Sequence, residues 1–495
     1  MKRHERKFRL MALLAAVSLT LTYATEPAHG ATVDWSDSFG GSYEASSNWT
    51  PPSPTGGPKV TDDVVFDLPN FYTVTFNSSP TNNSLSILDG DVTFTGIGIL
   101  PRVYTLNDAV EIDYGRLVLG NSIRPMHINI DLDSIYVNMG GRLDIVNGSL
   151  SNVACYIGAD LGALNTVTVG GVLGSSAVWT NSSLLSVGYN SHSALMIHNG
   201  GQVSNTDGYI AQNRDSTGTV TVQDAGSSWT NSGNLSIGGS LSASGGTGEL
   251  NVTGGSVSVA STLKVWPGSS LNLSGGQVTT ASMTVTDGGQ MNLTGGTLTV
   301  DGGAFNSLAP GISLNSDDNP TLNLINGATA SHSGEMMVAY NSEGTLNINS
   351  GSTLTTGNSL IGNSSGATGL VVVDDGTWTV SGIFSIGPGG IGELNITNGS
   401  TVSNSGTALV GSGTSGLGTI TIDNSTWNSA RLSLGQDGNG VMSIRNGGHV
   451  ITSEGEVGLH SSGTGQVTVD DGTWTNDGSL VLSHAGQAAL LIDNG

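Results

Sequence analysis

The sequence is poor in cysteine, in basic residues and in long apolar runs, and each shortage excludes a class of protein. Its 495 residues include one cysteine, Cys155, so no disulfide framework can stabilise the chain. Lys and Arg number 14 against 38 Asp and Glu, which gives a formal charge of −24. Nucleic acids and anionic lipids are bound by clusters of Lys and Arg, so neither is an expected partner. Beyond residue 30 no apolar run approaches the roughly 20 residues of a transmembrane helix.

Glycine is the residue in excess, and its abundance argues against long helices. The chain has 75 Gly and only 13 Pro. Glycine weakens helix interiors, and collagen is excluded because Gly does not recur at every third position. Hydrophobic residues (36%) and the 75 Gly together make up about half of the chain, so a sizeable core can form.

The first thirty residues predict export. Five basic residues are followed by a mostly apolar stretch, and the small residues Ala28 and Gly30 precede Ala31 as they would at a cleavage site. We therefore expect a secretory signal peptide at 1–30 and an exported protein at the cell surface or outside the cell. Cleavage would remove five basic and two acidic residues and change the formal charge from −24 to −27.

Internal repeats organise the remaining sequence. Tryptophan recurs in similar surroundings at spacings of 47 to 50 residues, and the 149 residues between Trp229 and Trp378 count as three such units. The tryptophans of this predicted ladder are Trp179, Trp229, Trp378, Trp427 and Trp474. Each unit is itself double, because Asn251, Asn272 and Asn292 begin similar segments 21 and 20 residues apart. The elementary coil is therefore about 20–25 residues long.

Within a coil, apolar and polar residues alternate in short runs that end in Gly or Asn, which indicates short strands and tight turns. Two or three strands in a coil of nearly fixed length, repeated many times, predict an all-β parallel β-helix (β-solenoid). We expect it to be right-handed, with Leu, Ile and Val stacked inward about 4.8 Å apart along the axis. Gly and Asn supply the positive φ that its corners need.

The predicted organisation has three parts and two irregular stretches. The parts are a signal peptide (1–30), an irregular N-terminal cap with the first strands (31–100), and solenoid repeats (101–495) that are clearest at 176–260 and 327–495. The stretch 306–320 is expected to lengthen one coil as a protruding loop. The last residues match the middle of a repeat, so we expect the sequence to be a fragment of a longer protein that lacks its anchoring segment.

The repeat resembles a known one. The residues that carry the resemblance are Thr377-Trp378, Phe384–Gly387, Gly392–Gly399, Val402-Ser403 and Val410-Gly411. They are similar to the repeats of autotransporter passengers and PEP-CTERM-associated bacterial surface proteins, and Asn48–Pro51 resembles the N-terminal segment common in those proteins. The resemblance implies export and placement at the cell surface or in a matrix, and it supplies no catalytic residues.

Residues that could perform chemistry are better explained by the repeat. Asp374-Asp375 and Asp470-Asp471 resemble paired carboxylates of a polysaccharide lyase or hydrolase, but both pairs begin four positions before a repeated Trp. We therefore predict that they are turn residues. The histidines show no metal-ligand spacing, and Cys155 lies in an uncharged run that predicts a buried thiol. We expect no catalytic residues, no metal site and no cofactor.

Three functions remain. The first is an exported structural stalk without catalysis, attached to a surface or matrix through a repetitive Ser, Thr and Asn surface. The second is a glycan-binding module that uses the Trp ladder, Trp35 or Trp49, or the 306–320 loop; alternation of Trp with Thr favours burial of the ladder instead. The third is a polysaccharide-active enzyme. Extracellular glycans or a matrix are the expected partners, nucleic acid is not, and the chain is expected to be monomeric.

Overall fold

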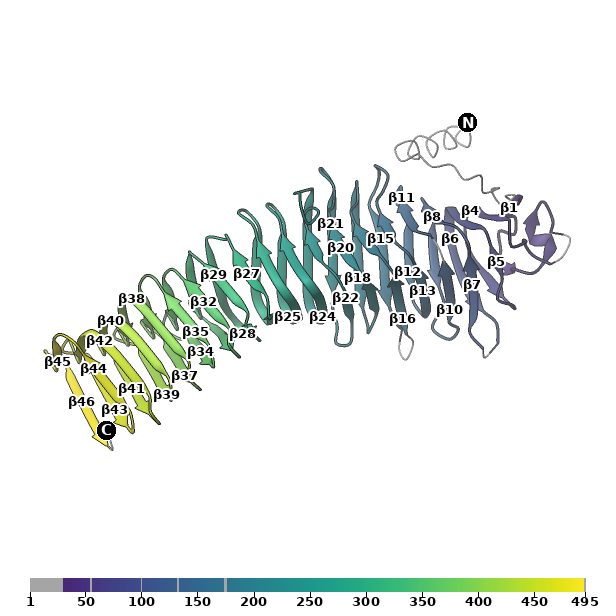
Figure 1. Ribbon diagram of the computed structural model, residues 1–495. Coiled ribbons are helices and arrows are strands. Elements are labelled where there is room, and N and C mark those ends of the chain that lie inside the picture. The colour runs from purple at the N-terminus through teal and green to yellow at the C-terminus, as the bar shows by residue number, and fades with distance from the viewer. Residues whose placement is uncertain (1–29, 54–55, 99, 131–132, 173–175, 494–495) are drawn as a thin grey trace, which may run out of the picture.

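The chain forms a single long solenoid of strands in the computed structural model (Figure 1). The structure describes all residues except 1–29, 54–55, 99, 131–132, 173–175 and 494–495, so the predicted signal peptide lies outside the described residues apart from Gly30. The described part is all-β with almost no helix and makes about 18 turns of a parallel β-solenoid, which confirms the predicted fold class. At about 4.8 Å per turn the rod is roughly 85 Å long. Its right-handedness stays a prediction.

The strands are short in most turns and fuse in the middle of the rod. The first are β1 (Thr32–Trp35), β2 (Gly41–Ser42), β3 (Trp49–Thr50), β4 (Asp63–Phe76), β5 (Thr81–Asn82), β6 (Ser84–Gly96), β7 (Arg102–Leu106), β8 (Val110–Asp113), β9 (Arg116–Leu119), β10 (Met126–Ile130), β11 (Ile135–Asn138), β12 (Arg142–Ile145), β13 (Gly148–Asn152), β14 (Cys155–Ile157), β15 (Asn165–Gly170) and β16 (Ala177–Asn181). Next come β17 (Leu184–Val187), β18 (His192–His198), β19 (Gln202–Asn205), β20 (Asp207–Ile210), β21 (Thr217–Val222), β22 (Ser228–Asn231), β23 (Leu235–Ile237), β24 (Thr247–Val265), β25 (Ser270–Val285), β26 (Gln290–Asp301), β27 (Ala304–Ser307), β28 (Gly311–Ile325), β29 (Thr329–His332), β30 (Glu335–Val338), β31 (Glu343–Asn349) and β32 (Thr353–Thr356). The last are β33 (Ser359–Ile361), β34 (Thr368–Asp374), β35 (Thr377–Val380), β36 (Phe384–Ile386), β37 (Ile391–Thr397), β38 (Thr401–Val410), β39 (Leu417–Asp423), β40 (Thr426–Leu434), β41 (Asn439–Arg445), β42 (His449–Val457), β43 (Thr464–Asp470), β44 (Thr473–Asn476), β45 (Leu480–Leu482) and β46 (Gln487–Asp493).

Each turn contributes one strand to each of three stacks, which we call A, B and C. One turn consists of β18 in stack A, β19 in stack B and β20 in stack C. These strands pair in parallel with β21, β22 and β23 of the next turn. Alternate residues of each strand point inward, so Val220 and Val222 are buried whereas Thr219 and Thr221 are partly exposed. The core is thus a set of apolar columns along the rod, as the alternation predicted.

The N-terminal end of the rod is closed by an irregular segment. Here β1 runs antiparallel to β3, with Trp35 opposite Trp49, and parallel to β4. The indoles of Trp35 and Trp49 meet edge to face at 4.9 Å. The buried aromatic residues packed at this end are Trp35, Tyr43, Trp49, Phe66, Tyr72, Phe76, Phe94 and Tyr104. Strand β4 already pairs with β6 of the following turn, so solenoid turns begin at Asp63.

The prediction that residues 306–320 form a protruding loop is wrong. Most of these residues belong to strands β27 and β28. Residues 311–314 of β28 lie in stack A, where Leu314 pairs with Leu293 of β26 and Ile312 with Met336 of β30. Residues 321–324 of the same strand continue in stack B. At the corner between these halves, Asp317, Asp318 and Asn319 are exposed. The 31 residues from Asn292 to Asn323 are therefore one turn plus one strand.

This extra strand moves the sequence repeat to the next stack. In the first half of the rod, Leu195–Asn205 places its two strands in stacks A and B. The matching segment Leu394–Asn404 places them in stacks B and C, because β37 continues the column of β22 and β38 continues the column of β23. The two blocks of repeats thus present equivalent surfaces on different faces. The single Trp ladder predicted from spacing is wrong: it is two ladders, in stack B before β24 and in stack C after β34.

Candidate functional site

The ladder tryptophans are core residues, which removes the Trp-based glycan site. Trp179, Trp229, Trp378 and Trp427 are fully buried, and Trp474 in the last turn packs partly buried against the core. Trp35 and Trp49 are buried as well. A buried indole cannot stack on a sugar ring in solvent, so the packing interpretation of these residues is confirmed.

Each ladder indole has a hydrogen-bond acceptor from the preceding turn. Trp229 Nε1 donates to Asn205 Oδ1 at 2.7 Å, and Trp378 Nε1 donates to Thr356 Oγ1 at 3.1 Å. The other pairs are Trp179 with Asn152 (2.8 Å), Trp427 with Asn404 (3.1 Å) and Trp474 with Thr452 (3.0 Å). In the preceding turn the acceptor always stands two residues after the partner of the Trp. A buried indole N–H group without an acceptor would destabilise the fold. Each ladder Trp therefore depends on the Asn or Thr of the preceding turn.

The same columns explain why the repeat is two turns long. Trp229 pairs with Val203 in the turn before and with Val257 in the turn after. Trp427 likewise lies between Val402 and Val450. An indole occupies the core position of one turn, and a smaller side chain with an Asn or Thr acceptor occupies the next. The 49-residue period is therefore a packing period.

The paired carboxylates lie at repeated corners, as predicted. Asp375 and Asp471 adopt φ of 53° and 51°, which is the left-handed turn conformation. Asp374 accepts hydrogen bonds from Thr397 Oγ1 (2.9 Å) and from the amide of Asn398, both one turn onward. The Asp374 carboxylate thus joins neighbouring corners of the rod.

The remaining candidates for chemistry are also structural. Cys155 is buried, and burial raises the pKa of its thiol well above the ordinary value of 9.0, so it stays a protonated apolar residue. His332 is buried between backbone carbonyls of Ser307 and Glu335. Within the described part of the chain, no group of three or more His, Cys, Asp or Glu side chains could hold a metal ion.

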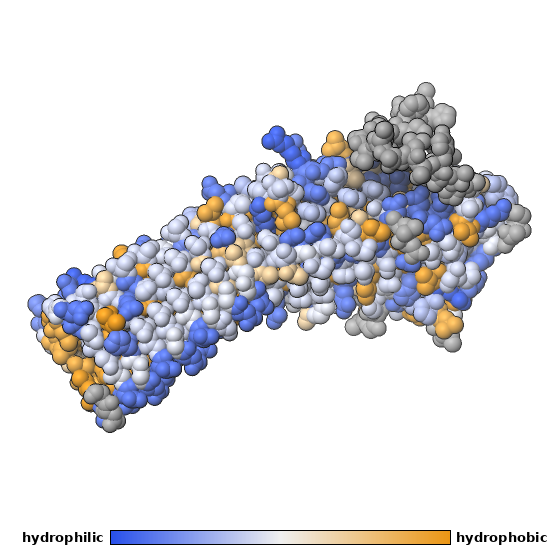
Figure 2. Space-filling model, in the orientation of Figure 1, coloured by the Kyte–Doolittle hydropathy of each residue, from blue (hydrophilic) through white to orange (hydrophobic). Residues whose placement is uncertain are grey.

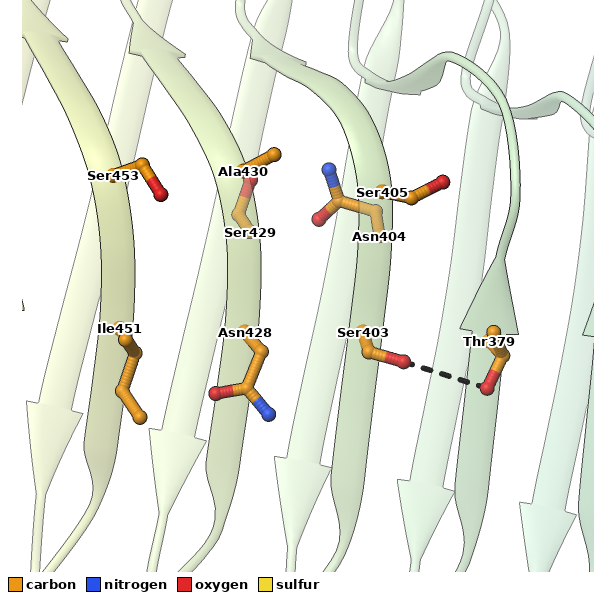
Figure 3. A pocket seen from close by; sticks show the side chains of 9 residues that line it. All are labelled: Thr379, Ser403, Asn404, Ser405, Asn428, Ser429, Ala430, Ile451 and Ser453. Atoms are coloured by element: carbon orange, nitrogen blue, oxygen red, sulfur yellow. Dashed lines mark hydrogen bonds between the residues drawn. The ribbon is translucent and has the colours of Figure 1, made fainter.

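A shallow groove crosses the outer surface of the C-terminal half. Its volume is about 360 Å³, and it runs across β35, β38, β40 and β42 where the chain bends from stack C towards stack A (Figure 3). Its lining residues are Thr379, Ser403, Asn404, Ser405, Asn428, Ser429, Ala430, Ile451 and Ser453. None is charged. The groove therefore offers hydroxyl and amide hydrogen bonds, and its lining includes no carboxylate, imidazole or amine that could act as a general acid or base.

The first block of repeats carries the same polar pattern on another face. Ser403 Oγ donates to Thr379 Oγ1 at 3.4 Å, and Ser204 Oγ donates to Thr180 Oγ1 at 3.5 Å. At the following corner, the hydroxyl of Ser405 donates to the Ser381 carbonyl (2.9 Å), as that of Thr206 does to the Ser182 carbonyl (3.0 Å). The space-filling view shows a pale surface of intermediate hydropathy over much of the C-terminal half (Figure 2).

Sequence reasoning missed an aromatic cluster on the outside of stack C. Tyr136, Tyr156 and Tyr209 occupy one outward column, and Tyr189 joins them from a corner. The 20-residue spacing of Tyr136 and Tyr156 equals one short coil and could have drawn notice. The column itself becomes visible only when the strand register is known, because Ser186 interrupts it.

The chain matches no protein-family model and no curated protein sequence. Among the described residues, no helix has the length and apolar character that crossing a membrane requires.

Proposed function

We propose that the chain is an exported structural repeat protein, a passenger-like stalk held at a cell surface or in an extracellular matrix and acting as a monomer without catalysis. The observation that carries the proposal is the unbroken pairing of about 18 turns into one rod. A rod of regular polar corners fits a role in which length and a repeated surface do the work, because many weak contacts add up when they are linked.

Two further observations support this proposal. The N-terminal residues have the composition of a secretory signal, and the repeat resembles those of autotransporter passengers and PEP-CTERM-associated surface proteins. Asp374 accepts a hydrogen bond from the next turn, and so does Asp423, which stands four positions before Trp427 in the same place of the repeat. The groove across β35, β38, β40 and β42 is lined by neutral hydroxyls and amides, which suit attachment to a hydroxyl-rich matrix.

Export is tested by expressing the tagged full chain in a Gram-negative bacterium beside a matched variant that lacks residues 1–30. We expect the full chain outside the cytoplasm with Ala31 as its first residue, identified by mass spectrometry, and the shortened variant inside. Recovery of the full chain in the cytoplasm with residues 1–30 intact would contradict the proposal. Release of reducing ends or unsaturated sugars from a polysaccharide panel would contradict the absence of catalysis.

A further inference from the structure

Four tyrosines form a cluster on the outer face of stack C in the first half of the rod. Tyr136 on β11 and Tyr156 on β14 are register partners, and their rings stack at 5.5 Å with an interplanar angle of 11°. The ring of Tyr189 meets that of Tyr156 edge to face at 5.0 Å. Tyr209 on β20 continues the column one position beyond Ser186. All four side chains are partly exposed.

These tyrosines point outward because their neighbours point inward. Cys155 and Ile157 flank Tyr156 on the same strand, and both are fully buried. Ile135 and Val137 flank Tyr136 in the same way. Strand alternation therefore fixes the direction of the rings. Among the described residues, every other pair of contacting aromatic rings lies in the core.

The centre of the cluster holds a hydroxyl group with no partner. Ser186 stands in the outward column between Tyr156 and Tyr209, yet its side chain is fully buried. Its Oγ makes no hydrogen bond in the structure. Buried polar groups are nearly always paired. Because Ser186 is fully buried, its hydroxyl lies beneath the contact surface, and the tyrosine side chains form that surface.

Carboxylates lie at both ends of the cluster. Glu111 is the register partner of Tyr136 in the preceding turn, and Asp207 stands two residues before Tyr209 on the same outward side. Burial, then the charge of Asp207, raises the pKa of Tyr209, and burial, then Asp133, raises that of Tyr136. The phenols therefore remain neutral hydrogen-bonding groups. A fixed negative charge at each end disfavours an anionic ligand.

We propose that Tyr136, Tyr156, Tyr189 and Tyr209 form a binding site for a neutral polysaccharide. The apolar faces of pyranose rings pack on the tyrosines, and sugar hydroxyls bond to the phenols and to the flanking carboxylates. A chain lying along the rod meets the tyrosines of successive turns. This inference rests on the proposed surface role, for which it names the ligand class and the residues.

The test is affinity electrophoresis of the purified chain in native gels that contain a soluble neutral glucan, galactan, mannan or xylan. Alginate and chitosan serve as the anionic and cationic arms. We expect retardation by at least one neutral polymer, and a dissociation constant about tenfold or more higher in Tyr136→Ala/Tyr156→Ala, as for a lost aromatic anchor. Tyr136→Phe/Tyr156→Phe keeps the rings and should retain most of the binding.

Tyr340→Ala is the matched control, because Tyr340 is 45% exposed on another part of the rod. It should bind like the unchanged chain, and all variants should give the same circular dichroism spectrum. Absence of retardation by every neutral polymer, or binding only in a charged arm, would overturn the ligand class. Equal retardation of the double alanine variant would overturn the site. Binding is measured on purified protein, so its failure is distinct from a failure of export.

Discussion

The side-chain oxygen that accepts a hydrogen bond from each ladder indole gives the sharpest prediction about stability. In Asn205→Ala, Trp229 Nε1 loses its acceptor at 2.7 Å and Asn231 Oδ1 loses its donor at 2.7 Å. Asn205, Trp229 and Asn231 are all buried, so solvent cannot replace either bond. Each buried polar group left unpaired costs about 1–3 kcal/mol. With two such groups, we therefore expect the local free energy of opening to fall by about 2–6 kcal/mol.

Hydrogen exchange followed by mass spectrometry measures this locally, because a solenoid opens in units of neighbouring turns. The peptide to follow contains β22 and the strand before it. Asn205→Thr is the matched control, since Thr356 and Thr452 accept from their indoles at 3.1 and 3.0 Å; it should cost about 1 kcal/mol or less. Unchanged protection in Asn205→Ala, or equal loss in both variants, would refute the assigned role of the acceptor.

Two other predictions follow from corners and burial. Gly387→Ala should destabilise more than Gly399→Ala in a urea melt: both have positive φ, but a Cβ at Gly387 would lie 2.1 Å from the Leu417 carbonyl oxygen, whereas Gly399 has nothing within 4 Å. Equal midpoints would contradict this. Cys155 should resist thiol reagents until the chain unfolds. Its folded pKa exceeds the unfolded value of about 9, so its contribution to stability is complete below pH 9 and declines as the pH rises above it; rapid labelling at pH 8 would contradict its burial.

Much of the fold could be predicted because the forces that specify it act at fixed spacing. Alternation in segments such as Glu393–Ile396 determines which side chains point inward, and the structure buries Leu394 and Ile396. The spacing of Asn251, Asn272 and Asn292 gave the coil length, and these residues form a side-chain ladder with amide contacts of 2.8 and 2.7 Å. Local pattern was sufficient for both.

Two features could not be predicted because they depend on register between distant segments. Ile312 and Leu314 alternate over only four residues between Pro310 and Pro320, which favoured a loop. Their role as a strand follows from the preceding turn, where Leu293 needs a partner in stack A. The tyrosine cluster likewise depends on which turns are neighbours. The spacing of repeats along the sequence cannot reveal either feature, because one added strand moves all later repeats to a different stack.

The extra strand within 306–320 is tested most directly by finding which residue of the preceding turn lies beside Asn323. In the structure Asn323 is the register partner of Thr299 and donates to its Oγ1 at 3.3 Å. Neighbouring strands lie about 4.8 Å apart, within the range a disulfide can span. Oxidation should therefore cross-link Thr299→Cys/Asn323→Cys rapidly and leave Asn292→Cys/Asn323→Cys reduced. Cross-linking of the second pair in place of the first would mean that 306–320 is a loop after all, and would contradict the extra strand that moves the repeat to a new face.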